Sequence, residues 1–174
     1  MSVFDNQPVN QSFLSPLGFK LQVKKTPAVN YNVQKVSLPS VSLGSADVET
    51  PFTKLPFPGT KLTFGNLQVT FKVDEDMNNY LEIYQWLRAV GFPDNFAQYT
   101  NMAGASLTSG DGVFSDISLI VLTGAKNPNM EVTFYDCFPV DLSGLDFDST
   151  SADVDYITAT VTFANRRFEV QQLV

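Results

Sequence analysis

The chain offers few side chains on which catalysis or metal binding could depend. It has 174 residues with no histidine and a single cysteine, Cys137. Histidine is the commonest general base and a frequent zinc ligand, so its absence excludes His-dependent triads and most zinc sites. The glycine-rich phosphate-binding patterns GxxxxGKS/T and GxGxxG do not occur. Paired carboxylates or a lysine nucleophile remain as routes to catalysis. We expect a protein that is not an enzyme and that uses no cofactor and no metal.

Two acidic clusters imitate cation sites. Asp74, Asp76 and Asn78 match the start of an EF-hand loop, but Asn79 replaces the required glycine and Gln85 the required glutamate. We interpret this cluster as the acidic beginning of a helix. The second cluster consists of Asp146, Asp148, Thr150, Asp153 and Asp155. A solvated turn before the last strand explains it best, with a cation site as the alternative.

Three further features could indicate binding sites. Trp86, the single tryptophan, could stack on a base or a sugar, but its helical spacing among apolar side chains indicates a core or interface position. Arg166 and Arg167 form too small a basic patch to indicate nucleic-acid binding. Cys137 lies in an alternating segment without a histidine to activate it, so we expect a half-buried, unreactive thiol.

Composition predicts one globular domain spanning residues 1–174. Hydrophobic residues make up 44% of the chain and charged residues 17%, which is typical of a folded domain. There is no apolar run of membrane-spanning length, no visible signal peptide and no possibility of an internal disulfide, so we expect no membrane association and synthesis in a reducing cytoplasm. The net charge of −7 is opposite in sign to that of a free nucleic-acid binder.

Alternating apolar and polar residues predict β-strands through most of the chain. Residues 17–24 and 29–36 alternate and are joined by a short connection, which predicts an antiparallel hairpin. Further strands are expected at residues 61–73, 114–122, 130–138 and 154–171, with a bend or bulge at Gly65. The expected class is mainly β, an antiparallel β-sandwich or barrel with one flanking α-helix.

The period changes to that of a helix over residues 77–90. Acidic residues precede it and Gly91 follows it, which are favourable start and stop signals. A helix this short depends on packing against the sheet. The residues expected on its packing face are Tyr80, Leu81, Tyr84, Trp86 and Leu87.

Residues 38–59 form the connection of greatest interest. This segment contains prolines and glycines, which argue against a helix, and it is too long and too apolar for an ordinary solvated loop. It must either fold over its own core or lie against another molecule, and we favour the second. We call residues 38–59 the contact arm. Its expected intersubunit residues are Pro39, Val41, Leu43, Val48, Phe52, Leu55 and Phe57.

The order of motifs resembles that of the tail tube proteins of contractile-tailed bacteriophages and the related baseplate proteins that start the tube. The points of similarity are a strand "VTFKVDE" entering a Trp-containing helix, the run "FPVDLSGL" after a later strand, and the final strand "ITATVTFANRRFEV". The similarity extends over residues 17–170.

The resemblance implies a fold, an assembly and a location. In that family, subunits close into a six-membered ring whose inner strands join in one continuous barrel, and the rings stack into a tube that conducts DNA without binding it specifically. The contact arm would reach neighbouring copies, and residues 1–16 would form an N-terminal arm that extends similarly. Sheath and baseplate proteins would be partners, and the protein would be assembled in the host cytoplasm and located in the virion tail.

The sequence favours the repeated tube subunit over its alternatives. Within the same class, a baseplate tube initiator or a cap ring at the end of the tail is the rival. From a different class, a carbohydrate-binding β-sandwich using Trp86 and surface tyrosine residues remains. An acidic channel wall would repel phosphates, which agrees with the net charge. The residues that could supply such a wall are Asp74, Asp116, Glu131, Asp136 and Asp155.

Overall fold

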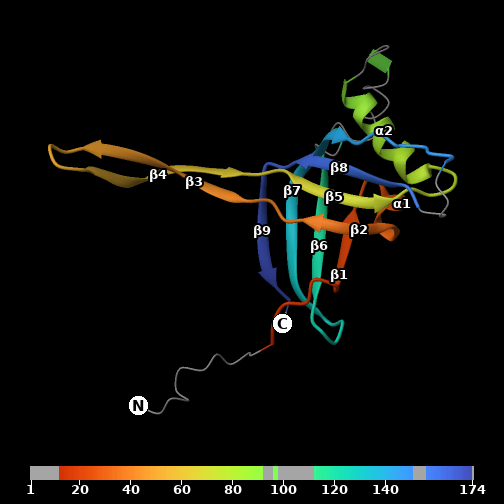
Figure 1. Cartoon of the computed structure of the whole chain (residues 1–174), viewed down its shortest axis with the longest axis horizontal. Coiled ribbons are helices and arrows are strands. Elements are labelled where there is room, and N and C mark those ends of the chain that lie inside the picture. Colours follow the sequence, from red (N-terminus) through yellow and green to blue (C-terminus); the bar gives the residue numbers. More distant parts are fainter. Residues whose placement is uncertain (1–11, 92–95, 98–111, 151–155, 174) are drawn as a thin grey trace.

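The computed structural model describes residues 12–91, 96–97, 112–150 and 156–173. Two helices and nine strands follow one another in these segments (Figure 1). In chain order they are β1 (Phe19–Val23), α1 (Pro27–Tyr31), β2 (Val33–Ser37), β3 (Val41–Glu49), β4 (Lys54–Phe64), β5 (Leu67–Lys72), α2 (Asn78–Gly91), β6 (Ser115–Leu122), β7 (Pro128–Leu142), β8 (Thr158–Ala164) and β9 (Arg167–Gln172).

Seven strands form one continuous antiparallel sheet in the order β1-β6-β7-β8-β5-β2, and β9 also pairs with β7. The 15-residue strand β7 belongs to both halves of this sheet. Its first part pairs with β9 and its last part with β8. Figure 1 shows β9, β7, β6 and β1 side by side, with β8, β5 and β2 running across them. The first group is called the four-stranded half below.

The bend between the two halves lies at Asp136, which has a positive φ of 54°. The β6–β7 register shifts opposite this residue, and its backbone N–H donates to the Asp116 carboxylate at 3.2 Å. A bulge of this kind bends a strand and increases its twist. The sheet therefore folds over on itself and encloses a core between its halves.

The core is made of the alternate side chains that point inward from both halves, together with one side chain of α1 and two of α2. These buried residues are Leu21, Val23, Val29, Leu67, Val69, Phe71, Ile83, Trp86, Ile117, Leu119, Val132, Phe134, Cys137, Ala159, Val161 and Phe163. The predicted class, mainly antiparallel β with a flanking helix, is confirmed.

Helix α2 begins one residue later than expected and includes Gly91. The acidic residues precede the helix and do not lie within its first turn. The buried Asn79 ties this entry together: it donates to the Lys72 carbonyl at 2.7 Å and to the Asp74 carboxylate at 2.9 Å. Asp74 also accepts a hydrogen bond from Asn32. The EF-hand imitation is thus a helix entry, as interpreted.

The expected hairpin of residues 17–24 and 29–36 is wrong. Residues 27–31 form α1, which begins with Pro27, a favourable first helical residue. β1 pairs with β6, and β2 pairs with β5, so the two strands lie at opposite ends of the sheet order. Alternation over so few residues does not distinguish one helical turn from a strand.

Two segments expected as single strands are each two strands. Residues 61–73 separate at Gly65 into the end of β4 and the whole of β5, and residues 154–171 separate at Asn165 into β8 and β9. Among the described residues, no helix is long and apolar enough to cross a membrane.

Candidate assembly surfaces

The contact arm is not an irregular loop, which corrects the sequence-based interpretation. β3 and β4 pair as an antiparallel two-stranded ribbon from Val41↔Phe64 to Glu49↔Lys54. Figure 1 shows this β3–β4 hairpin projecting well away from the body. Pro56 and Pro58 lie within β4, where a two-stranded ribbon tolerates residues that cannot donate a backbone hydrogen bond.

A backbone hydrogen bond and a side-chain ion pair hold the tip of the hairpin, and the two strands approach closely in its middle. At the tip, the Thr50 N–H donates to the Thr53 carbonyl at 3.1 Å, and Lys54 pairs with Glu49 at 3.4 Å. In the middle, the register shifts after Leu43, and a Cβ at Gly59 would lie 2.4 Å from the Gly44 carbonyl oxygen. Only glycine fits there.

The root of the hairpin is anchored to the body. Gly65 donates its N–H to the Ser40 carbonyl at 2.9 Å and accepts a bond from the Asn165 side chain at 2.9 Å. The Phe64 and Phe168 rings meet edge to face, with 5.4 Å between centroids. Pro39 is buried at this root. The direction of the hairpin is therefore set by the body.

Six of the seven expected contact residues are exposed on the hairpin. Their exposed fractions lie between 45% for Leu55 and 97% for Phe52. Pro39 differs because it packs within the chain itself. Leu62, which the sequence interpretation left outside the arm, is half exposed on β4 as well. The exposed apolar residues of the hairpin are Val41, Leu43, Val48, Phe52, Leu55, Phe57 and Leu62.

The four-stranded half of the sheet ends in two open edges. Among the described strands, β1 pairs only with β6, and β9 pairs only with β7. The N–H and C=O groups along an unpaired edge form a template for another strand. Figure 1 shows the two edges on opposite sides of the body. Sequence reasoning could not say which strands form the open edges, because edges follow from strand order and not from local pattern.

The face of this half that turns away from the core is polar and carries both signs of charge. Residues paired across β1, β6, β7 and β9 form rows on this face. One row runs from Lys20 through Ile120 and Glu131 to Gln171, and a second runs from Gln22 to Glu169. The charged residues of this open face are Lys20, Asp116, Glu131, Arg167 and Glu169.

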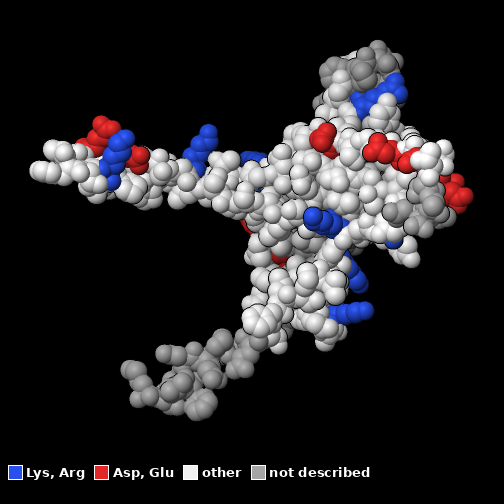
Figure 2. All heavy atoms as spheres, in the orientation of Figure 1, with Lys and Arg blue, Asp and Glu red and all other residues white. Residues whose placement is uncertain are grey.

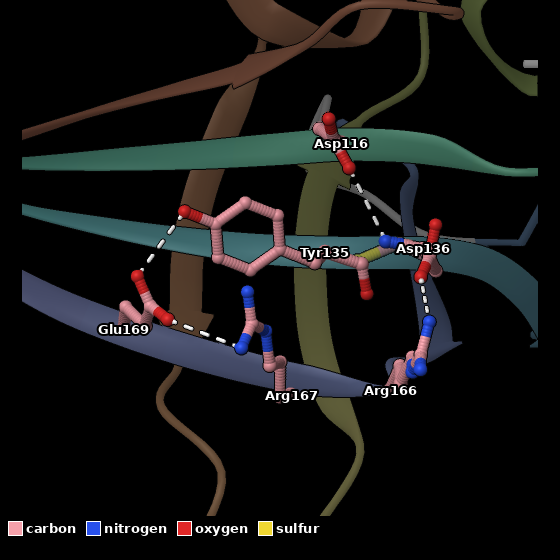
Figure 3. A network of polar contacts seen from close by, with 7 residues as sticks. Asp116, Tyr135, Asp136, Arg166, Arg167 and Glu169 are labelled. Carbon is pink, nitrogen blue, oxygen red and sulfur yellow. Dashed lines mark hydrogen bonds and ion pairs between the residues drawn. The ribbon is translucent and has the colours of Figure 1, made fainter. Parts of the chain in front are cut away.

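Figure 3 shows how this face is tied together at the end where β9 begins, next to the bend in β7. Arg167 pairs with Glu169 at 3.4 Å and lies over the Tyr135 ring, 4.9 Å from its centroid. The Tyr135 hydroxyl donates to Glu169 at 3.3 Å. Burial raises the pKa of Tyr135 above its ordinary value, and Glu169 raises it further. Arg166 pairs with Asp136 at 3.4 Å.

Three of the five residues expected on the packing face of α2 contact the core, and two do not. Trp86 is 3% exposed and donates its indole N–H to the Val113 carbonyl at 2.9 Å, and Tyr80 and Leu87 pack partly against the core. Leu81 and Tyr84 are exposed, because Asn79, Ile83 and Trp86 occupy the inward face. Tyr80, Tyr84 and Leu87 line a groove of about 490 Å³ beside the end of β7.

The burial of Trp86 excludes a sugar-stacking role for this residue, which removes one of the two features on which the carbohydrate-binding alternative rested and leaves the surface tyrosines. In the second acidic cluster, Thr150 donates to Asp148 from its N–H at 2.8 Å and its hydroxyl at 2.6 Å, which lowers the pKa of Asp148. This is a turn stabilised by its own side chains. Asp153 and Asp155 lie outside the described residues. Across the described part of the chain, no three acidic or cysteine side chains are grouped as a metal site.

Cys137 is fully buried, which is deeper than expected. Burial raises the pKa of its thiol to about 12, and the nearby Asp116 and Asp136 carboxylates raise it as well. Charged side chains are scattered elsewhere: Figure 2 shows no large patch of one sign on the face viewed. The candidate functional features of the described part of the chain are its exposed hairpin, its open strand edges and its open face.

Comparison with solved structures identifies the fold. A chain of the PVC sheath–tube complex of an extracellular contractile injection system, in its extended state, matches with a TM-score of 0.61 at 16% identity, covering 94% of each chain. The tube-terminating cap of the anti-feeding prophage matches with a TM-score of 0.62 at 14% identity, covering 99% of each chain. The fold is that of the tube and cap components of contractile injection machines.

The chain belongs to the phage tail tube protein family, whose model matches residues 4–171. It is also 25% identical over 151 residues to the tail tube terminator protein of Enterobacteria phage T4, covering 84% of this chain and 81% of that protein. The chain is thus a structural component of a phage tail, as the resemblance implied.

Proposed function

We propose that the chain forms the ring that terminates a phage tail tube, with a structural role and no catalysis. The observation that carries this is its similarity to the T4 tail tube terminator over four fifths of both chains. The sequence interpretation favoured the repeated tube subunit and kept a cap ring as the rival. The terminator similarity reverses that preference.

Ring closure is supported by the directions of the strands. β1, β6, β7 and β9 alternate in direction, so β1 and β9 are antiparallel to each other. In a ring, every copy has the same orientation along the axis. β9 of one copy therefore meets β1 of the next in antiparallel orientation, and the four-stranded halves join into one closed barrel without an open edge. We propose six copies, as in the family.

The β3–β4 hairpin supplies the second contact. A two-stranded ribbon alone is marginally stable in water, and this one carries its apolar side chains into solvent. Packing on a neighbouring copy or on the adjacent tube ring would bury them, which is the role proposed for the contact arm. Because the root is anchored, the hairpin can present these side chains without a large loss of chain entropy.

The open face of the four-stranded half would line the channel. It carries three carboxylates and two cations and is therefore mixed in charge, not the uniformly acidic wall first expected. Arg167 is already paired with Glu169, which reduces its attraction for phosphates. Such a face lets DNA pass without specific binding. Sheath and baseplate proteins are the further partners proposed, in the virion tail after assembly in the host cytoplasm.

A repeated tube subunit is the second candidate, favoured by the description of the family. The two functions differ in how many copies a tube contains and where they lie. A terminator occupies one end, whereas a tube subunit is found along the whole length.

The test is addition of the purified protein to growing tubes made from the tail tube protein of the same phage. A terminator should form discrete rings alone, bind at one tube end in electron micrographs and stop elongation. Long tubes formed by the protein alone, or incorporation along the tube wall, would instead establish the repeated subunit. A stable monomer at high concentration, without binding to tube ends, would refute both.

A further inference from the structure

The open edge of β1 is closed at one end by a side chain. Leu122 donates to the Gly18 carbonyl, and hydrogen-bonded pairs alternate along an antiparallel ladder. Phe19, Leu21 and Val23 therefore turn their backbone groups toward the free edge. The Asn30 side chain occupies both groups of Val23, accepting from its N–H at 2.7 Å and donating to its carbonyl at 3.3 Å.

The open edge of β9 follows from the same reasoning. Leu173 donates to the Asn129 carbonyl, in register with the β7–β9 ladder, so the odd-numbered residues of β9 bond to β7. Phe168, Val170 and Gln172 turn their backbone groups outward. Phe168 packs against the core, and Val170 projects on the same side and is half exposed.

The two edges match in the faces that they present. Leu21 is buried in the core and Phe19 packs against it. When residues of the two edges pair through hydrogen bonds, opposite side chains lie on the same face. Joining β9 to β1 thus continues the apolar layer on one face and the polar open face on the other.

Two registers place both open residues of β1 opposite open residues of β9. In the first, Phe19 faces Val170 and Leu21 faces Phe168, which brings Lys20 opposite Glu169. In the second, shifted by two residues, Phe19 faces Gln172 and Leu21 faces Val170, and Lys20 meets Gln171. The first has two apolar pairs and an opposite-charge pair, which stabilise a sheet, whereas the second has one apolar pair.

Asn30 affects only the second register. Without it, the second register would gain a third hydrogen-bonded pair, between Val23 and Phe168. In the first register, Val23 would face Arg166, which precedes β9. Removing Asn30 therefore adds no hydrogen-bonded pair to the first register. Because Asn30 already holds the backbone groups of Val23, the advantage of the second register is removed.

We propose that β9 of one copy pairs with β1 of a second copy in the register Phe19↔Val170 and Lys20↔Glu169, and that Asn30 is the stop that selects it. This inference rests on the proposed ring. A groove of about 670 Å³ beside β1, lined on its far side by Tyr31 and Val33, receives the incoming strand. Tyr31 is almost fully exposed in the single chain and would cover that strand.

Engineered disulfides test the register. Lys20 and Glu169 would form a non-hydrogen-bonded pair with Cα atoms about 4.5 Å apart, which suits a disulfide. In the same register Lys20 and Gln171 are diagonal, at about 7–8 Å, which is too far. The variant K20C/E169C and the matched control K20C/Q171C are each oxidised at ring-forming concentration. The unmodified chain is oxidised as well, to measure any disulfide formed by the native Cys137.

The expected result is intermolecular disulfide in K20C/E169C at least tenfold above that in K20C/Q171C, with covalent ladders up to the full ring. A reversed ratio would overturn the register while leaving the barrel intact. Rings without disulfide in either variant would overturn edge pairing between β9 and β1. If neither variant nor the unmodified chain forms rings or binds tube ends, the proposed function itself fails.

A second pair of variants tests the stop. N30A is added to both cysteine backgrounds, and folding is checked by circular dichroism. The K20C/Q171C product should rise several-fold relative to K20C/E169C, because the second register regains its third pair. An unchanged ratio in a folded N30A chain would overturn the role of Asn30.

Discussion

Replacing Phe52 with alanine should weaken assembly without affecting the fold. Phe52 lies at the tip of the β3–β4 hairpin and is 97% exposed, so the single chain loses no buried contact. The free energy of unfolding of the single chain should change by less than about 0.5 kcal/mol, as is usual for surface substitutions. Burying a phenylalanine side chain in an interface is worth about 1.5–3 kcal/mol. At about 1.4 kcal/mol per factor of ten, the assembly constant should fall roughly 10- to 150-fold.

The assay is sedimentation velocity across a concentration series, which gives the concentration at which rings or tube-end complexes appear. Thermal unfolding of the same samples reports the fold. Phe147→Ala is the matched control, because that ring is 74% exposed but lies far from the hairpin in the sequence. Phe71→Ala, at a fully buried position, should by contrast cost about 3–5 kcal/mol of folding stability. An assembly threshold that Phe52→Ala leaves unchanged would refute the contact role of the hairpin tip.

Three further outcomes are expected. Asn79→Ala should lower the free energy of unfolding by about 1–3 kcal/mol in urea titrations, since it leaves buried backbone groups unpaired; equal stability would contradict the role given to this side chain. Gly59→Ala should disrupt the hairpin but not the body, because its Cβ would lie 2.4 Å from the Gly44 carbonyl, and hydrogen exchange should be faster in β3 and β4 alone. Cys137 should not react with a thiol reagent at pH 8 until the chain is unfolded. Because burial raises its pKa from 9.0 to about 12, the folded chain retains the proton longer, and stability should be full below pH 9 and fall as the pH rises toward 12. Rapid labelling of the folded chain would contradict this.

Several expectations could be made from local pattern and were confirmed. The helical spacing before Gly91 identified α2 to within one residue, since an amphipathic helix of this length is a strong signal. Trp86 was expected in the core and is there. The arm was recognised as unusual from its length and its apolar residues, among them Val41 and Phe52, although its strands were not recognised and its contact role stays a prediction.

The hairpin escaped prediction for a physical reason. Both faces of β3 and β4 are in solvent, so no alternation of apolar and polar residues is needed, and prolines within β4 argue against a strand. The helix face was also misjudged in part. Asn79 lies on the buried face of α2, where a pattern of apolar residues would not place a polar side chain. It can be buried there because its side-chain amide donates hydrogen bonds to Lys72 and Asp74.

The sequence by itself determined the general character of the chain: it has no histidine, it is mainly β with one substantial helix, and it contains a long apolar segment between two strands. These properties depend on residue type and on neighbours a few positions apart. Only the tertiary structure decided which strands end the sheet, that β1 and β9 are antiparallel, and that Asn30 closes one edge at Val23. Such relations join residues far apart in the chain, and packing of the whole molecule selects them.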